Sequence, residues 1–422
     1  MELMQDLSKT DPEVLKQIKN ELGRIRNGIE LIPSENFVSK AVLQACASVF
    51  TNKYSEGYPH KRYYGGNEFV DNVEDIAIER AKKLFKAEHV NFQPYSGSPA
   101  NQAVFFALLK LGDKFMGLDL SCGGHLTHGS HVNFSGINYK NVPYNVDKET
   151  NLLDYDQIRK TADREKPKLI LSGLTAYPRK LDFKEFEEIA KDVGAYHMSD
   201  IAHIAGLCIT GYHQSPVPHA DVVTTTTHKT LRGPRGAIIL CREKYSQAID
   251  KAVFPGLQGG PHDHVTAAKA VAFKEALQPD YREYIGQVVK NAKALSEDLM
   301  SLGVKLVTDG TDNHLMLIDL TPKKLTGKGK EVQIALEEAG IYTNKNTIPY
   351  EPASPFNPSG IRIGTPAITT RGFKESEMKE VAKAIATVID NYQDKKILEK
   401  VRKDILEICN QFPLYEGLDI LK

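Results

Sequence analysis

Several features that mark specialised protein classes are missing from the sequence. Its charges are balanced, with 54 Lys plus Arg against 54 Asp plus Glu. Because that balance leaves no net field, we expect no nucleic acid and no anionic membrane to be drawn to the molecule as a whole. No apolar stretch reaches the roughly 18 residues that a membrane-spanning helix needs. The first residues mix acids and bases without the apolar core of a signal peptide. We therefore expect neither a membrane-spanning helix nor a signal peptide.

Cysteine is also scarce. The chain contains five, an odd number scattered without CxxC spacing, at Cys46, Cys122, Cys208, Cys241 and Cys409. This distribution argues against a disulfide framework and against a structural zinc site, and it fits a reducing compartment. We therefore expect a cytoplasmic protein.

The amino-acid composition is typical of a globular protein. The chain has 422 residues, of which 41% are hydrophobic and 26% charged. At roughly 150 residues per domain, this length predicts two or three compact units. The composition excludes a disordered tail and a collagen-like fibre.

The pattern of apolar residues predicts an α/β protein. Asp11 and Pro12 are typical of a helix start, and an amphipathic helix is expected after them. From about 50 to 275, short β-rich runs alternate with helical patterns, which predicts a mainly parallel sheet covered by helices. The runs are HVNFQP, DKFMGLDL, KLILSG, GAYHMSD, ADVVTTTT and GAIILC. From about 278 a long charged helix begins, followed by further strands and helices. We expect a helical arm at 1–49, a large domain at 50–277 and a smaller C-terminal α/β domain at 278–422.

Lys229 stands at the exit of a predicted strand, in the segment TTTTHKTLRGPRG (224–236). Ligands of open α/β sheets bind at the carboxyl ends of strands, where a lysine can form a Schiff base with a carbonyl compound. For any single lysine, a solvated position after an edge strand is the commoner fate.

Asp200 ends a second predicted strand, in GAYHMSD (194–200). Pyridoxal phosphate works as an electron sink when its ring nitrogen stays protonated, and a paired aspartate raises the pKa of that nitrogen. Taken alone, Asp200 is equally explained as a helix N-cap. Lys229 and Asp200 together, each at a strand end, are much less expected by chance.

The segment YSGSPAN (95–101) lies between a predicted strand and a predicted helix. Backbone N–H groups at the helix start, with the Ser96 and Ser98 hydroxyls, form a suitable site for a phosphate. The motif is weak, because Ser and Gly also simply cap helices.

Together with these segments, further motifs carry a resemblance to a known family. LIPSENF, NKYSEGYPHKRYYGG, YSGSPAN, GGHLTHGS, SDIAHIAGL, VVTTTTHKTLRGPRG, FPGLQGGP and SGIRIGTPAITTRG occur in the order and spacing of serine hydroxymethyltransferases. The likeness extends over roughly residues 12 to 412, and TTTTHK followed by GPRG is highly specific. It implies a fold-type I pyridoxal-phosphate enzyme, aspartate-aminotransferase-like, with a seven-stranded sheet in the large domain.

The resemblance implies reversible transfer of the serine hydroxymethyl carbon to tetrahydrofolate, giving glycine and 5,10-methylenetetrahydrofolate. Pyridoxal 5′-phosphate is implied to be covalently bound to Lys229, with tetrahydrofolate as co-substrate. A β-hydroxy-amino-acid (threonine or allo-threonine) aldolase is the minor alternative, and a cofactor-binding scaffold without turnover is the non-enzymatic one.

The resemblance also assigns residues to roles. The implied catalytic residues are Lys229, Glu56, His228, Asp200 and Tyr64. The implied cofactor site comprises Ser96, Gly97, Ser98, His125, Thr175, Asp200, His203, Thr226, Lys229, Arg235, Gly259 and Gly260. Substrate would be held by Ser34, Tyr54, Glu56, Tyr64 and Arg362, and folate by Leu120, Gly124, His125, Leu126, Ser354, Pro355 and Phe356.

In this family Tyr54, Glu56, Tyr64, Gly259 and Gly260 come from the neighbouring subunit, which implies a homodimer with shared active sites and possibly a tetramer.

Arg362 suits a carboxylate because a planar guanidinium matches it, although a surface arginine at a strand end is an equal alternative without the other motifs.

Some positions depart from the family pattern. His60 stands where glycine is common, and we expect it to add a titrating charge close to Glu56. Pro33 replaces a small residue before Ser34, and Ser199 stands where valine is frequent.

Two further clusters invite other interpretations. Cys122, His125, His128 and His131 are spaced three apart like metal ligands, but a loop is the simpler interpretation, and we expect no metal. The lysines of TPKKLTGKGK (321–330) are better explained as a solvated connection than as a site for RNA or for a folate polyglutamate tail.

Overall fold

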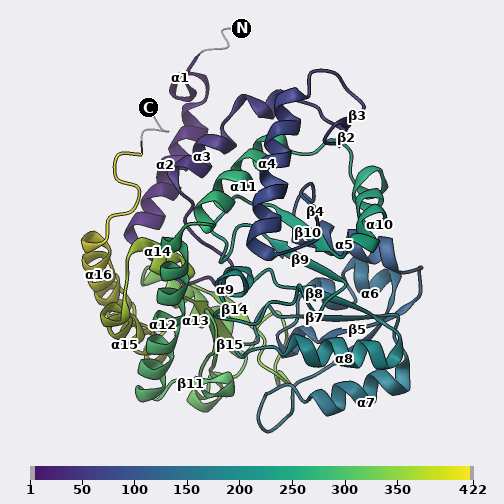
Figure 1. The fold of residues 1–422 in the computed structure, drawn as a ribbon. Coiled ribbons are helices and arrows are strands. Elements are labelled where there is room, and N and C mark those ends of the chain that lie inside the picture. Colours follow the sequence, from purple (N-terminus) through teal and green to yellow (C-terminus); the bar gives the residue numbers. More distant parts are fainter. Residues whose placement is uncertain (1–4, 419–422) are drawn as a thin grey trace.

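A seven-stranded sheet forms the centre of the computed structural model, which describes residues 5–418 (Figure 1). The strand order is β4-β10-β9-β8-β7-β5-β6, and only β10 runs antiparallel to its neighbours. The mainly parallel sheet expected from the sequence is therefore confirmed. The strands are β4 (His89–Asn91), β5 (Lys114–Leu118), β6 (Lys140–Tyr144), β7 (Leu169–Gly173), β8 (Tyr196–Asp200), β9 (Val222–Thr226) and β10 (Ala237–Cys241).

All of these strands except β6 correspond to the β-rich runs expected from the sequence. Strand β6 pairs only with β5 at one edge of the sheet, contains Pro143, and is only partly buried. An edge strand needs no continuous apolar run and tolerates proline, so its pattern is weak.

Both faces of the large sheet are covered by helices, as a parallel sheet requires. Neighbouring strand residues point to opposite faces: Phe115 and Leu169 pack in one core, and Met116 and Ile170 in the other. One face is covered by α5 (Gly97–Leu108), α6 (Phe134–Asn138) and α10 (Ser246–Lys251), and the other by α4 (Glu68–Phe85), α7 (Tyr155–Glu165), α8 (Phe183–Val193) and α11 (Asp263–Ala276).

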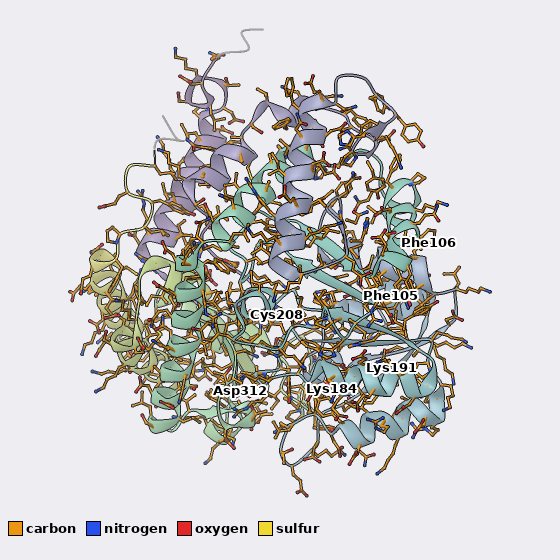
Figure 2. The ribbon with its side chains drawn as sticks, viewed as in Figure 1. Phe105, Phe106, Lys184, Lys191, Cys208 and Asp312 are labelled. Carbon is orange, nitrogen blue, oxygen red and sulfur yellow. The ribbon has the colours of Figure 1, made fainter. Side chains whose placement is uncertain are left out.

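The covering helices are amphipathic. On α8, Phe186 is fully buried, whereas Lys184 and Lys191 extend from the outer surface (Figure 2). On α5, Phe105 is buried but its neighbour Phe106 is 56% exposed (Figure 2). Period-3.6 patterns of this kind made the helices recognisable in the sequence.

A second, four-stranded sheet has the order β11-β12-β15-β14 and its own hydrophobic core. Its strands are β11 (Lys305–Leu306), β12 (Leu315–Asp319), β14 (Asn344–Asn346) and β15 (Gly360–Gly364), with helices α12 (Pro279–Ser301), α13 (Gly329–Glu338), α14 (Pro366–Arg371), α15 (Glu375–Asp390) and α16 (Lys395–Gln411). Helix α12 joins the two cores, because Ile285 packs in the first and Leu299 in the second.

The N-terminal segment packs against the second core. Asp11 caps α2 (Pro12–Asn27) by accepting a hydrogen bond from the Val14 N–H at 2.9 Å, as expected. The buried Arg371 donates to backbone oxygens at the end of α2 and to that of Cys409 on α16. The first four residues of the expected arm and the last four of the expected C-terminal domain lie outside the described residues.

The remaining elements are short. They are α1 (Leu7–Thr10), β1 (Ile29–Glu30), α3 (Lys40–Cys46), β2 (Gly57–Tyr58), β3 (Lys61–Arg62), α9 (Ala205–Thr210) and β13 (Ile341–Tyr342), which pairs with β1. Within residues 5–418, we find no helix with the length and apolarity to cross a bilayer.

Candidate active site

A cavity of about 270 Å³ lies where β7, β8 and β9 end and where β15 of the second sheet approaches them. It is lined by Ser34, Ser96, Gly97, Ser98, His125, Thr175, Asp200, Ala202, His203, Thr226, His228, Lys229, Arg235 and Arg362. All of these except Ala202 were singled out from the sequence. Segments more than three hundred residues apart in the chain therefore meet in one hollow.

Lys229 follows β9 by three residues and is only 8% exposed. Strand β9 lies inside the sheet, between β8 and β10, so the alternative of a solvated lysine after an edge strand is wrong. Burial lowers the pKa of Lys229 to about 8, against the opposing effect of the Asp200 charge. A lysine in this range has an appreciable fraction of neutral, nucleophilic amine.

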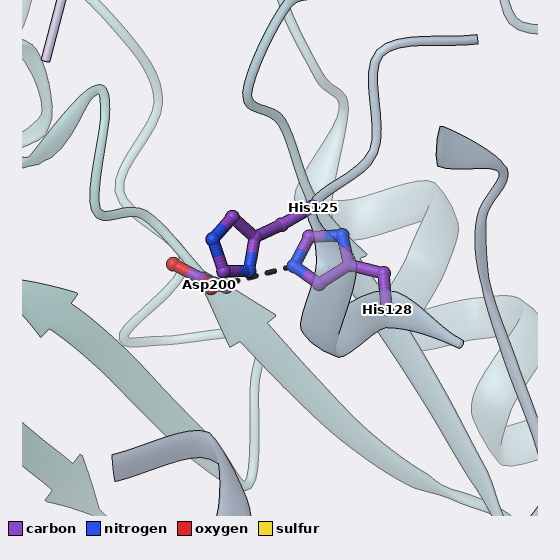
Figure 3. A group of neighbouring side chains, drawn as sticks. All are labelled: His125, His128 and Asp200. Carbon is purple, nitrogen blue, oxygen red and sulfur yellow. Dashed lines mark hydrogen bonds and ion pairs between the residues drawn. The ribbon is translucent and has the colours of Figure 1, made fainter. Parts of the chain in front are cut away.

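Asp200 is the last residue of β8 and is also buried. Its carboxylate accepts hydrogen bonds from Asn101 Nδ2 at 2.8 Å and from the Ala202 N–H at 3.0 Å, and it pairs with His128 Nε2 at 3.3 Å (Figure 3). Burial alone would raise the pKa of Asp200, but these partners outweigh it and hold the pKa well below its usual value. The N-cap alternative is wrong, because the N-cap of α9 is Ile204.

The turn before α5 has the form of an anion site. Ser96 occupies the N-cap position, yet its side chain makes no capping hydrogen bond. A Cβ at Gly97 would lie 2.9 Å from Thr226 Cγ2, so only glycine lets the turn approach the end of β9 this closely. The helix start thus offers backbone N–H groups and a free hydroxyl to an anion in the cavity.

Arg362 lies in the middle of β15 and is 8% exposed, so the alternative of a surface arginine is wrong. Its Nε donates to Asn344 Oδ1 at 3.0 Å and its Nη1 to the Thr175 backbone oxygen at 2.7 Å. Burial lowers its pKa to about 10, and within residues 5–418 no carboxylate pairs with it. A buried guanidinium without an acidic partner is suited to a carboxylate ligand.

A second group of predicted residues lies outside this cavity. Tyr54 donates to Glu56 Oε1 at 3.3 Å, and the Tyr54 and Tyr64 rings meet edge to face at 5.2 Å. Gly259 and Gly260 lie against Glu56 and Tyr54. A Cβ atom at Gly259 would be 3.0 Å from Glu56 Oε1, and one at Gly260 would be 3.2 Å from the Tyr54 ring. Tyr54 and Tyr64 are exposed and the other three residues are half-buried; we call these five residues the Glu56 cluster.

His60, which departs from the family pattern, contacts two acids. Its ring Nε2 pairs with Asp75 Oδ2 at 2.8 Å, and its backbone N–H donates to Asp71 Oδ2 at 3.1 Å. The side chain is thus engaged with acids of α4 rather than with Glu56, because the β2–β3 turn directs it towards that helix.

Of the residues implied for folate, only His125 lines the cavity. Leu120 and Leu126, on either side of it, are 42% and 44% exposed, and Gly124 is buried. Phe356, with Ser354 and Pro355 beside it, is 86% exposed. Exposed leucines beside a cavity supply an apolar surface for a flat ligand.

Several residues that shape the site were missed in the sequence. Asn101 and His128 contact Asp200, Asn344 orients Arg362, and His314 Nε2 lies 3.3 Å from His203 Nδ1. Asn101 was visible at the end of YSGSPAN, but nothing in the sequence indicated that it contacts Asp200. The other three are single polar residues whose partners come from distant segments.

The ligand atoms of His125, His128 and Asp200 all lie within 4.8 Å of one another (Figure 3). They do not form the Cys122–His131 cluster considered from the sequence. His125 Nδ1 and His128 Nε2 already have hydrogen-bond partners in Thr127 and Asp200, so the group is accounted for without a metal. The absence of a metal stays a prediction.

A family model described as Serine hydroxymethyltransferase matches residues 7–385, which is most of the chain.

Proposed function

The chain belongs to the serine hydroxymethyltransferase family, and from this premise we propose which of its residues carry out the reaction. The protein is a pyridoxal-phosphate-dependent enzyme that transfers the hydroxymethyl carbon of serine reversibly to tetrahydrofolate, giving glycine and 5,10-methylenetetrahydrofolate. The observation that carries the residue assignment is the shared cavity, in which a buried lysine, a buried aspartate and an unpaired buried arginine meet.

The residues of the cavity fit pyridoxal phosphate. Lys229 would hold it covalently, Asp200 would pair with its ring nitrogen, and the turn of Ser96, Gly97 and Ser98 would bind its phosphate. His125, Thr175, His203, Thr226, His228 and Arg235 complete the wall around it. When bound, the cofactor supplies an electron sink for a bond broken at the substrate Cα.

The protein side chains have distinct tasks in this proposal. Asp200 keeps its negative charge at neutral pH because its pKa is depressed, so it would favour a proton on the cofactor's ring nitrogen. Arg362, with Ser34, binds the substrate carboxylate. A carboxylate fixed there restricts rotation of the amino acid, which limits the bonds at Cα that are held in a reactive orientation.

Besides Lys229, which the cofactor would occupy, the cavity offers few groups that exchange a proton at neutral pH. Asp200 is its single carboxyl group, and burial lowers the pKa of His125 to about 4 and of His228 to about 3. We assign proton transfer to Glu56, assisted by Tyr54 and Tyr64. Because the Glu56 cluster lies outside its own cavity, we propose that a second copy of the chain supplies it, in a homodimer and possibly a tetramer.

Subunit complementation tests this arrangement. Lys229→Ala and Glu56→Gln subunits, each inactive alone, are mixed under conditions that exchange subunits. If the Glu56 cluster acts in the neighbouring cavity, each mixed dimer has one intact site, and about a quarter of wild-type activity is expected for random pairing.

A matched pair of variants controls that experiment. Lys229→Ala and Asp200→Asn both change the same cavity, so their mixed dimers have no intact site and should stay inactive. Absence of recovery in the Lys229→Ala and Glu56→Gln mixture would place Glu56 in its own subunit's site or outside catalysis.

The remaining assignments follow from the surfaces around the cavity. We place folate against Leu120, Gly124, His125 and Leu126, and near Ser354, Pro355 and Phe356. Serine, glycine and tetrahydrofolate are then the small-molecule partners, with no role for nucleic acid or membrane. The five unpaired cysteines support a cytoplasmic location.

A further inference from the structure

A continuous hydrogen-bond chain connects β9 to the imidazole of His125 through side chains that the proposed mechanism does not use. Thr224 Oγ1 donates to Asn101 Oδ1 at 2.6 Å. Asn101 Nδ2 donates both to Asp200 Oδ2 and to Thr127 Oγ1, each at 2.8 Å. Thr127 Oγ1 lies 2.7 Å from His125 Nδ1. Thr224, Asn101 and Thr127 are each at most 1% exposed, so water does not compete for these groups.

The chemistry of the groups fixes the direction of each bond. An ionised carboxylate only accepts, so the NH₂ side of Asn101 must face Asp200 and its oxygen must face Thr224. The second Asn101 hydrogen points at Thr127 Oγ1, which leaves the Thr127 hydroxyl hydrogen free to point at His125 Nδ1. The Thr127 backbone N–H also lies 3.2 Å from the same nitrogen, and a backbone N–H can only donate.

We propose that Asn101 and Thr127 are positioning residues that hold His125 as the neutral tautomer with its proton on Nε2. His125 then takes part in the reaction as a hydrogen-bond donor through Nε2, and not as a proton acceptor. Burial, which lowers the pKa of His125 to about 4, supports the neutral ring. The role in the reaction rests on the proposed function, whereas the tautomer rests on the contacts alone.

The Asn101 amide that donates to Thr127 also donates to Asp200. Because Thr127 contacts His125, the orientation of His125 depends on the charge of Asp200. A neutral group at position 200 would no longer dictate which way the amide points. Asn101 and Thr127 thereby connect Asp200 to His125, and both of these residues line the cavity. This connection also leaves proton transfer to Glu56, as the proposed function assigns it.

Histidine NMR tests the tautomer directly. The holoenzyme is labelled with ¹⁵N-histidine, and the His125 ring signals are assigned by their loss in His125→Asn. At neutral pH we expect an unprotonated Nδ1 and a protonated Nε2. A proton on Nδ1 in the wild-type protein overturns the proposal without any further variant. This result would leave the Lys229 and Glu56 complementation experiment unaffected.

Variants at Thr127 test the positioning role. Thr127→Val keeps the shape but removes the hydroxyl, and we expect the second tautomer to appear and kcat to fall several-fold, with the KM for serine little changed. Thr127→Ser restores the hydroxyl and should restore the single tautomer. Thr387→Val, at a hydroxyl that bonds only the Lys383 backbone oxygen on α15, is the matched control. A single unchanged tautomer in both Thr127→Val and Asn101→Ala would overturn the assignment.

Discussion

Arg362 donates a hydrogen bond from Nη1 to the Thr175 backbone oxygen at 2.7 Å, and this contact connects the two sheets at the cavity. Arg362 belongs to β15 of the small sheet, whereas Thr175 follows β7 of the large one. Because Asn344 holds Nε at the same time, the guanidinium plane is oriented before any ligand binds. A pre-oriented fork loses little entropy when it binds a carboxylate.

Arg362→Lys should therefore impair substrate binding without unfolding the protein. The charge remains, but the two-point contact is lost. We expect kcat/KM for serine to fall by about 10- to 100-fold, as charged hydrogen bonds of about 1.5–3 kcal/mol imply. Steady-state kinetics measures this, with the exposed Arg402, which donates to the Glu338 backbone oxygen, changed to Lys as a control. Equal kcat/KM values in the two variants would contradict the carboxylate assignment.

The depressed pKa of Lys229 should be visible when cofactor-free protein captures pyridoxal phosphate. Only the neutral amine attacks an aldehyde, so the capture rate should rise with pH around an apparent pKa of about 8. Stopped-flow absorbance between pH 6 and 10 follows the reaction. The Asp200 charge raises the pKa of Lys229, so Asp200→Asn should move the midpoint to lower pH. A midpoint at the ordinary lysine value of about 10.4 would show that Lys229 is not desolvated.

Asp200 should also stabilise the cofactor-free protein in a pH-dependent manner. Its pKa is depressed in the folded state, so its contribution is fully present above the unfolded pKa of about 3.9 and is lost as pH falls from there towards the folded pKa. Denaturant unfolding of wild-type protein and Asp200→Asn checks this. We expect the wild-type advantage to be constant from pH 5 to 6 and to shrink below about pH 4. If the stability difference between wild-type protein and Asp200→Asn grew as the pH fell, the depressed pKa of Asp200 would be contradicted.

Two serines at paired positions of β7 and β8 should respond in opposite ways to loss of the hydroxyl. Ser172 and Ser199 are register partners, but Ser172 Oγ lies 2.9 Å from His197 Nε2, whereas buried Ser199 Oγ has no partner among the described residues. Ser199→Ala should stabilise the protein by up to about 1 kcal/mol, and Ser172→Ala should destabilise it by a similar amount. Thermal unfolding of both variants measures these changes. A lower melting temperature for Ser199→Ala than for wild-type protein would mean that the Ser199 hydroxyl has a hydrogen-bond partner.

Much of the fold was predictable because its signals are local. The start of α2 at Pro12 follows from a capping residue and a first-turn proline, and the strands carrying Asp200 and leading to Lys229 are buried on both faces, so they are continuous β-rich runs. Strand β6 escaped detection because an edge position places few demands on its residues.

The sequence by itself determined which residue types stand at the strand ends and helix starts, since those positions depend on neighbours a few residues away. Tertiary structure alone decided that β15 brings Arg362 to the same cavity, that the Glu56 cluster stays outside it, and that Asn101 lies between Asp200 and Thr127. The physical reason is the range of the interactions. Capping and periodicity act within one or two turns, whereas the partner of a buried polar group is set by packing between segments distant in the chain.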